Sequence, residues 1–282
     1  ADQVPVAFLL LKRPPVLPAW ADEGGFFEGA KGGLTLRNYY FNRDFRDPGA
    51  AKGKVEEWAQ GFIFKFSSGY TPGLIGFGLD GIAMFGVKLD SGRGTSGSEL
   101  LPVHDDGRAA DDYGRAGLAA KLRISATELK VGELLPDIPL LRYDDGRLLP
   151  QTFRGAMLDS REIEGLSLQA GQYREVSLRH SSDMQDLSAW AAPGVTSDGF
   201  NYAGAEYRFN QQRTLIGAWH SQLEDIYQQS YFNLLHPQPL GNWTLAANLG
   251  YFIDKEDGQA RIGDIQSRTA YGLVSASHSG HT

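Results

Sequence analysis

Segment 73–89, GLIGFGLDGIAMFGVKL, alternates between two kinds of side chain along its length. One set, from Ile75 to Val87, carries no polar side chain. The other set mixes glycines with two charged and two apolar side chains, Asp80, Lys88, Ile82 and Met84. Because successive side chains of a β-strand point to opposite faces, the pattern predicts a strand with one apolar face. Ile82 and Met84 then point to the polar face, either beneath an infolded loop such as 136–151 or because a bulge shifts the register.

Similar alternation recurs in segments separated by polar connections, which predicts an all-β chain of roughly twelve strands. Short connections, at 126–127, 210–212 and 237–241, alternate with long ones, at 90–112 and 136–151. This alternation is typical of an antiparallel up-and-down transmembrane β-barrel, which has short turns at one end and long loops at the other. The alternative is a soluble β-sandwich, but sandwich strands of about 5–6 residues are shorter than most of these segments. The remaining predicted strands are 34–42, 57–66, 113–125, 128–135, 153–163, 165–175, 200–209, 213–222, 227–235, 242–252 and 269–277.

Composition excludes several classes of protein. A net charge of −7 over 282 residues provides no basic excess with which to bind nucleic acid. The chain lacks any apolar run of about 18 residues, so no transmembrane helix is predicted. Mean hydropathy of −0.32 is typical of a soluble protein, but the polar face of a membrane β-barrel lowers the mean in the same way. The absence of cysteine argues weakly against a small disulfide-stapled domain.

The first 21 residues differ from the rest of the chain. A short apolar stretch at 6–11 is followed, not preceded, by Lys12 and Arg13, and the sequence AWA at 19–21 resembles a signal-peptide cleavage site. We interpret residues 1–21 as a signal-peptide remnant or a flexible tail. The predicted barrel therefore comprises residues 22–282.

Strand parity separates apolar rows from basic rows. The apolar rows often have aromatic residues near their ends (Trp58, Trp243 and Tyr251), as in the girdles at the two membrane interfaces. Acidic residues gather mainly in the predicted loops. A soluble sheet would also carry charges on its wet face, but cations lining a narrow lumen would select anions. The predicted lumen cations are Arg37, Lys65, Lys88, Arg115, Lys121, Arg123, Lys130 and Arg208.

Other motifs carry little chemistry. The six histidines lack zinc-ligand spacing apart from the unspecific HSGH, and LPVHDDGRAADD lacks the spacing of a calcium loop. GFGLDG is not a dinucleotide fingerprint, and no GxSxG motif occurs. The sequence therefore predicts no catalytic residues, no metal site and no cofactor, and an enzyme is not expected.

Ordered motifs resemble the OprD (Occ) family of substrate-specific outer-membrane channels of Gram-negative bacteria. They include LRNYYFNRD (36–44), LPVHDDGRAADDYGRAG (101–117), KLRISATELKVGE (121–133), EIEGLSLQAGQYRE (162–175) and QLEDIYQQSYFN (222–233). The resemblance implies a monomeric barrel of about eighteen strands with a basic ladder that guides small carboxylates. Lys121, Arg123 and Lys130 match that ladder. The resemblance also makes 136–151 the inward constricting loop, which contains Arg142, Tyr143, Asp144, Asp145 and Arg147.

The chain departs from the family pattern at its end. It stops at SASHSGHT, without a terminal apolar strand, and the alternation predicts about twelve strands. We interpret the chain as a fragment; a barrel that closes with fewer strands is the alternative.

The predicted function is passive outer-membrane uptake of small carboxylates, with the aromatic or monocyclic branch of the family favoured. The predicted surroundings are outer-membrane lipid and lipopolysaccharide. The rival predictions are a soluble all-β carbohydrate- or ligand-binding protein and an outer-membrane barrel enzyme.

Overall fold

The computed structural model describes residues 25–47, 49–189, 192 and 194–278, so the predicted tail 1–21 lies outside the described residues. Within them, no helix is long and apolar enough to cross a membrane. The strands are β1 (Lys31–Asp44), β2 (Lys54–Ser67), β3 (Ile75–Ser91), β4 (Asp112–Ile124), β5 (Thr127–Leu134), β6 (Asp137–Ile138), β7 (Leu141–Arg142), β8 (Thr152–Ser160), β9 (Leu166–Ser177), β10 (Gln185–Ser188), β11 (Thr196–Ser197), β12 (Phe200–Phe209), β13 (Thr214–Leu223), β14 (Tyr227–Leu240), β15 (Trp243–Glu256) and β16 (Gln266–His278).

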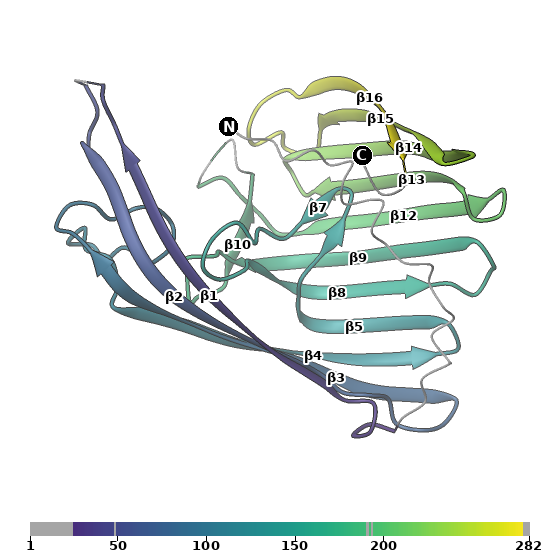
Figure 1. The fold of residues 1–282 in the computed structure, drawn as a ribbon, viewed down its shortest axis with the longest axis horizontal. Coiled ribbons are helices and arrows are strands. Elements are labelled where there is room, and N and C mark those ends of the chain that lie inside the picture. The colour runs from purple at the N-terminus through teal and green to yellow at the C-terminus, as the bar shows by residue number, and fades with distance from the viewer. Residues whose placement is uncertain (1–24, 48, 190–191, 193, 279–282) are drawn as a thin grey trace.

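The long strands form one curved sheet in which neighbours along the chain are neighbours in space (Figure 1). Its order is β1-β2-β3-β4-β5-β8-β9-β12-β13-β14-β15-β16, and adjacent strands are antiparallel. The predicted up-and-down all-β fold is therefore confirmed. Connections 92–111 and 135–151, together with the described residues of the β9–β12 connection (178–189, 192 and 194–199), lie at one end, which we call the long-loop end. The connections at the other end, the short-turn end, include 125–126 and 241–242.

The two faces of the sheet follow the predicted parity. On β4, Leu118 and Ile124 are exposed, whereas Ala119 and Lys121 are buried. We call the exposed apolar side the outer face and the opposite side the inner face. Exposed aromatic residues lie on the outer face towards both strand ends, including Tyr40 and Trp58 at the long-loop end and Tyr207, Phe209 and Trp243 at the short-turn end. This arrangement fits a lipid-facing surface with two aromatic girdles.

Ile82 and Met84 point to the inner face, as the parity of 73–89 predicts. They are buried in a cluster with Leu148 and Leu149 from the β5–β8 connection. The infolded loop, and not a bulge at these positions, therefore explains the two apolar residues. A bulge does interrupt the β2–β3 pairing, but it lies nearer the long-loop end, between Trp58 and Ala59.

One predicted turn is wrong. Segment 237–241 is not a connection, because β14 continues through Pro237 and Pro239 and turns only at 241–242. Proline lacks an N–H and is tolerated in a strand where no ladder partner is needed. The β13–β14 pairing stops at Leu215 and Leu235, so the two prolines lie beyond it and pair only with β15.

Inner-face aromatic rings lie over glycines of the preceding strand. A Cβ at Gly204 on β12 would lie 2.0 Å from the ring of Trp219 on β13, and one at Gly250 on β15 would lie 2.0 Å from the ring of Tyr271 on β16. The missing side chains thus leave room for rings that stack flat along the inner face. Similar pairs occur at Gly86–Tyr113, Gly155–Tyr173 and Gly171–Tyr202.

Gly204→Ala should destabilise the sheet, because the added methyl group overlaps the Trp219 ring. Overpacking of this kind typically costs about 1–3 kcal/mol, which denaturant unfolding in detergent or lipid would measure. Gly33→Ala is the matched control, because Gly33 lies in β1 with no atom within 4 Å of its Cβ position. Equal stability of the two variants would contradict the ring–glycine packing.

Candidate functional site on the inner face

The β5–β8 connection, residues 135–151, crosses the inner face as far as β1. The Arg37 guanidinium on β1 binds the Asp145 carboxylate through its two terminal nitrogens, at 2.8 Å and 3.2 Å. It also donates to the carbonyl of Arg147 at 2.6 Å. Leu148 packs over Gly61 on β2, where a Cβ would lie 3.1 Å from the leucine side chain. The loop thus leaves the wall at β5 and reaches a strand four places away in the sheet order.

The five predicted constriction residues occupy different surroundings. Arg142 forms an exposed ion pair with Asp137. Tyr143 packs against the larger apolar cluster, and burial, aided by Asp145 and Asp137, raises the pKa of its phenol. Asp144 contacts Arg179, while Asp145 holds Arg37.

Arg147 extends the loop's contacts to two other parts of the molecule. It donates to the carbonyl of Ser98 at 2.9 Å and lies over the ring of Phe41. All five predicted residues therefore contribute to the loop or to its contacts.

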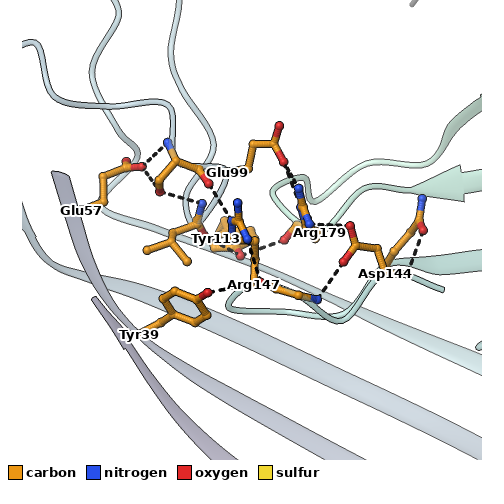
Figure 2. A network of polar contacts seen from close by, with 11 residues as sticks. Tyr39, Glu57, Glu99, Tyr113, Asp144, Arg147 and Arg179 are labelled. Carbon is orange, nitrogen blue, oxygen red and sulfur yellow. Dashed lines mark hydrogen bonds and ion pairs between the residues drawn. The ribbon is translucent and has the colours of Figure 1, made fainter. Parts of the chain in front are cut away.

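Arg179 links the three long loops (Figure 2). Its guanidinium contacts Glu99 of the 92–111 loop and Asp144 of the 135–151 loop. Nearby, the buried Glu57 on β2 accepts hydrogen bonds from the backbone N–H and hydroxyl of Ser98, and the Tyr113 hydroxyl donates to the carbonyls of Leu100 and Arg179. No spacing in the sequence identifies this network, because its members are too distant from one another in the chain.

Arg115 and Lys88, two predicted lumen cations, support these loops. The Arg115 guanidinium on β4 donates to the carbonyls of Leu178 (3.1 Å), Ser181 (2.6 Å) and Pro150, beside Glu133. Lys88 lies 2.5 Å from Asp111 and donates to the carbonyl of Ala109. The hydrogen bond from the Lys88 ammonium to the Asp111 carboxylate holds the pKa of Asp111 below its ordinary value.

Two lysines and an aspartate meet on the inner face of β3, β4 and β5. The Lys121 ammonium lies 2.7 Å from one oxygen of Asp80, and the Lys130 ammonium lies 2.8 Å from the other. Lys121 also donates to the hydroxyl of Ser67 and the carbonyl of Ser68, and its side chain is 4% exposed. Lys130 is more accessible, with 24% exposure, and its second acidic neighbour is Glu128 at 3.4 Å.

Arg123 lies beside this group, towards the short-turn end. The ring of Tyr70, from the β2–β3 connection, stacks 4.4 Å from its guanidinium and 5.0 Å from the Lys121 ammonium. The Tyr70 hydroxyl donates to Glu128. Together, Lys121, Arg123 and Lys130 carry one more positive charge than Asp80 and Glu128 carry negative charge.

The two remaining predicted cations lie apart from this group. Lys65 is an exposed residue on the inner-face parity of β2, and Arg208 is half-buried on that of β12. Neither forms an ion pair with another described residue. The eight predicted cations therefore separate into residues that support loops, the Lys121–Arg123–Lys130 group, and these two.

Acidic partners on the strands were underestimated from sequence. Asp80, Glu128 and Glu133 all lie on strands, not in loops, and each contacts a predicted lumen cation. Among the described residues, no group of three or more histidine, aspartate or glutamate side chains is arranged to hold a metal ion.

Comparisons with known proteins agree with this architecture. Residues 24–282 match the model of the OprD family of outer-membrane porins. The chain is 59% identical over 266 residues to the porin-like protein GalP of Pseudomonas putida. That alignment covers 94% of this chain and 65% of GalP. It is thus a β-sheet protein of the porin class.

Solved structures give the same result. OpdK of Pseudomonas aeruginosa, crystallised with vanillate, has a TM-score of 0.84 at 68% identity over 90% of this chain and 64% of its own. A BenF-like porin from Pseudomonas fluorescens Pf-5 has a TM-score of 0.88 at 55% identity, covering 91% of this chain and 66% of that one. The chain belongs to the OprD family of outer-membrane porins, which are channels and not enzymes. It spans slightly less than two thirds of these relatives' length.

Family membership decides between the rival sequence predictions. OprD-family porins are integral β-barrel proteins of the Gram-negative outer membrane, so the predicted localisation is confirmed. The soluble all-β binding protein and the barrel enzyme are both wrong. Which cations contact a solute remains a prediction.

Arg179→Met should loosen the long loops, because it removes the contacts to Glu99 and Asp144. Hydrogen bonds to charged groups contribute about 1.5–3 kcal/mol, so loop opening should become markedly more frequent. Single-channel recordings should then show more current fluctuation. Arg161→Met is the control, since it breaks an ion pair with Asp159 at the short-turn end; equal noise in both variants would contradict the linking role of Arg179.

His180 should make the same loops sensitive to acid. Burial lowers its pKa below 6.5, with Arg179 acting in the same direction and Glu99 and Glu57 opposing it. Opened loops, in which the imidazole is solvated, therefore bind a proton that closed loops do not, and closure weakens as pH falls below about 6.5. Hydrogen exchange of residues 178–189, corrected for intrinsic rates, should rise between pH 7.5 and 5.5. His180→Gln should abolish that rise; an unchanged rise would assign it to another group.

Proposed function

We propose that this protein forms a passive outer-membrane channel for small carboxylate-bearing solutes. The observation that supports the proposal is the gathering of Lys121, Arg123 and Lys130 on neighbouring strands of the inner face. The three cations outnumber Asp80 and Glu128, the described acids beside Lys121 and Lys130, in a chain whose overall net charge is −7. Local positive charge on the wall of a narrow pore lowers the electrostatic cost of an entering anion.

The infolded loop supplies the size limit in this proposal. Residues 135–151 cross the inner face and are attached at β1 through Arg37 and Asp145. Apolar packing of Leu148 and Leu149 against Ile82 and Met84 holds the same loop to the wall. A loop held to the wall by these two contacts narrows the passage without having to open for each solute.

Orientation follows from loop length. Long loops of outer-membrane barrels are external and short turns are periplasmic. Solute then meets the loops joined by Arg179 first, and reaches the Lys121–Arg123–Lys130 group afterwards. The outer face contacts lipid and lipopolysaccharide, and the protein acts as a monomer.

The favoured solutes are aromatic or monocyclic carboxylates. OpdK, 68% identical to this chain, was crystallised with vanillate, an aromatic carboxylate. A planar guanidinium such as that of Arg123 can bind a carboxylate through two hydrogen bonds, which suits this class of solute.

Arg123→Ala should reduce anion selectivity, because it removes one positive charge from the inner wall. In water-like surroundings, a unit charge about 6 Å away changes the local concentration of a monovalent ion about threefold. The anion-to-cation permeability ratio should therefore fall by at least that factor. Reversal potentials in planar bilayers, together with benzoate uptake, measure the effect.

Arg174→Ala is the matched control for this experiment. Arg174 is exposed on β9 and shares the outer-face parity of Leu168. Its replacement by alanine therefore removes the same charge at a position away from the lumen. Unchanged selectivity and uptake in Arg123→Ala would refute a role for that residue in the channel.

A further inference from the structure

Asp80 occupies the place where a solute carboxylate would bind the two lysines. One of its oxygens faces Lys121 at 2.7 Å and the other faces Lys130 at 2.8 Å. A carboxylate shared between two ammonium groups is the contact that a solute carboxylate would make with these two lysines in the proposed channel. Here the wall itself supplies that carboxylate.

The two lysines are held unequally. Lys121 has three partners, since it binds Ser67 and Ser68 in addition to Asp80, and it is almost completely buried. Among the described residues, Lys130 is paired with two carboxylates, and the second, Glu128, lies farther away at 3.4 Å. Lys130 is also partly exposed, so an incoming anion can reach it. Lys121 therefore fixes Asp80 in place, while Lys130 is the partner available for exchange.

We propose that Asp80 is a specificity-determining residue that competes with the solute carboxylate for Lys130. The inference rests on the proposed function, because it assumes that carboxylates pass along this wall. Conduction requires binding that is favourable enough for entry and weak enough for release. A tethered carboxylate meets both needs: it keeps Lys130 positioned between solutes and displaces each solute as it leaves.

The acidic partner also limits the charge of the group. With Asp80 ionised, the two lysines have the carboxylates of Asp80 and Glu128 beside them among the described residues. Removal of the Asp80 charge takes away the carboxylate that Lys121 and Lys130 share and leaves Glu128 beside Lys130. A monovalent anion should then be held longer, which would raise selectivity at the expense of transit rate.

Asp80→Asn tests the proposal in the full chain reconstituted in planar bilayers. It removes the charge with little change in shape. Reversal potentials in a KCl gradient should shift towards stronger anion selectivity, with the anion-to-cation permeability ratio raised about threefold. Benzoate-induced current blocks should lengthen by a similar factor. Asp80→Glu, which keeps the charge, should resemble the unmodified protein in both measurements.

Glu206→Gln is the matched control for general loss of lumen charge. Glu206 lies on the inner-face parity of β12 and forms no ion pair with a described residue. Its loss should leave the benzoate blocks unchanged. Lengthened blocks in both variants, or in neither, would overturn the competition between Asp80 and the solute.

Lys130→Met separates this inference from the proposed function. If competition for Lys130 is correct, Asp80→Asn in a Lys130→Met background should no longer lengthen the blocks; lengthening that persists would overturn it. If Arg123→Ala and Lys130→Met both leave anion selectivity unchanged, the proposed function itself fails. If those variants change selectivity but Asp80→Asn does not, only the role of Asp80 fails.

Discussion

The two-residue period of each strand is the constraint on which the rest of the structure depends. Neighbouring strands pair their backbone groups sideways, so each side chain must go to one face or the other. Lipid favours an apolar outer face, and charged strand residues such as Asp80, Lys121 and Lys130 are directed inward. Asp80 reaches Lys121 and Lys130 for this reason: it has inward parity on a strand whose outward residues include Phe77 and Phe85.

The inner face is organised by loops, since no bilayer covers it. Apolar residues with inward parity, such as Ile82 and Met84, are packed by Leu148 and Leu149. Long polar loops also carry backbone carbonyls that need donors once they are buried. Arg115 meets that need, because its guanidinium binds three carbonyls of two different loops. A cation on a pore wall can thus be structural, and parity alone does not distinguish this role from solute binding.

Much of the fold could be predicted from the sequence because alternation is a local property. The long strands and their faces followed from parity, whereas Ile82 and Met84 left two explanations open, a loop packed above them or a bulge, and the structure shows the loop. The turn at 237–241 was predicted wrongly because proline usually ends a strand, and only the point at which β13 stops pairing makes Pro237 and Pro239 acceptable.

Contacts between distant strands and loops were beyond the same reasoning. Arg37 and Asp145 are separated by 108 residues, and no periodicity relates them. The Asp80 contacts depend on the register of three strands, which places Gly78 opposite Lys121 and Lys121 opposite Lys130. Parity identified Lys121 and Lys130 as inward cations, but it could not show that they share a carboxylate.

The pairing of acids with cations changes how a basic pore wall should be understood. A row of unpaired lysines would repel itself and bind anions strongly, which favours entry but slows release. Asp80 and Glu128 reduce that repulsion and keep the side chains in fixed positions. In the proposed channel, what would favour an anion is the small excess of Lys121, Arg123 and Lys130 over the described acids Asp80 and Glu128. A channel that depends on such a small excess can be retuned by a single charge on its wall, and such changes need not alter the strands that form the barrel.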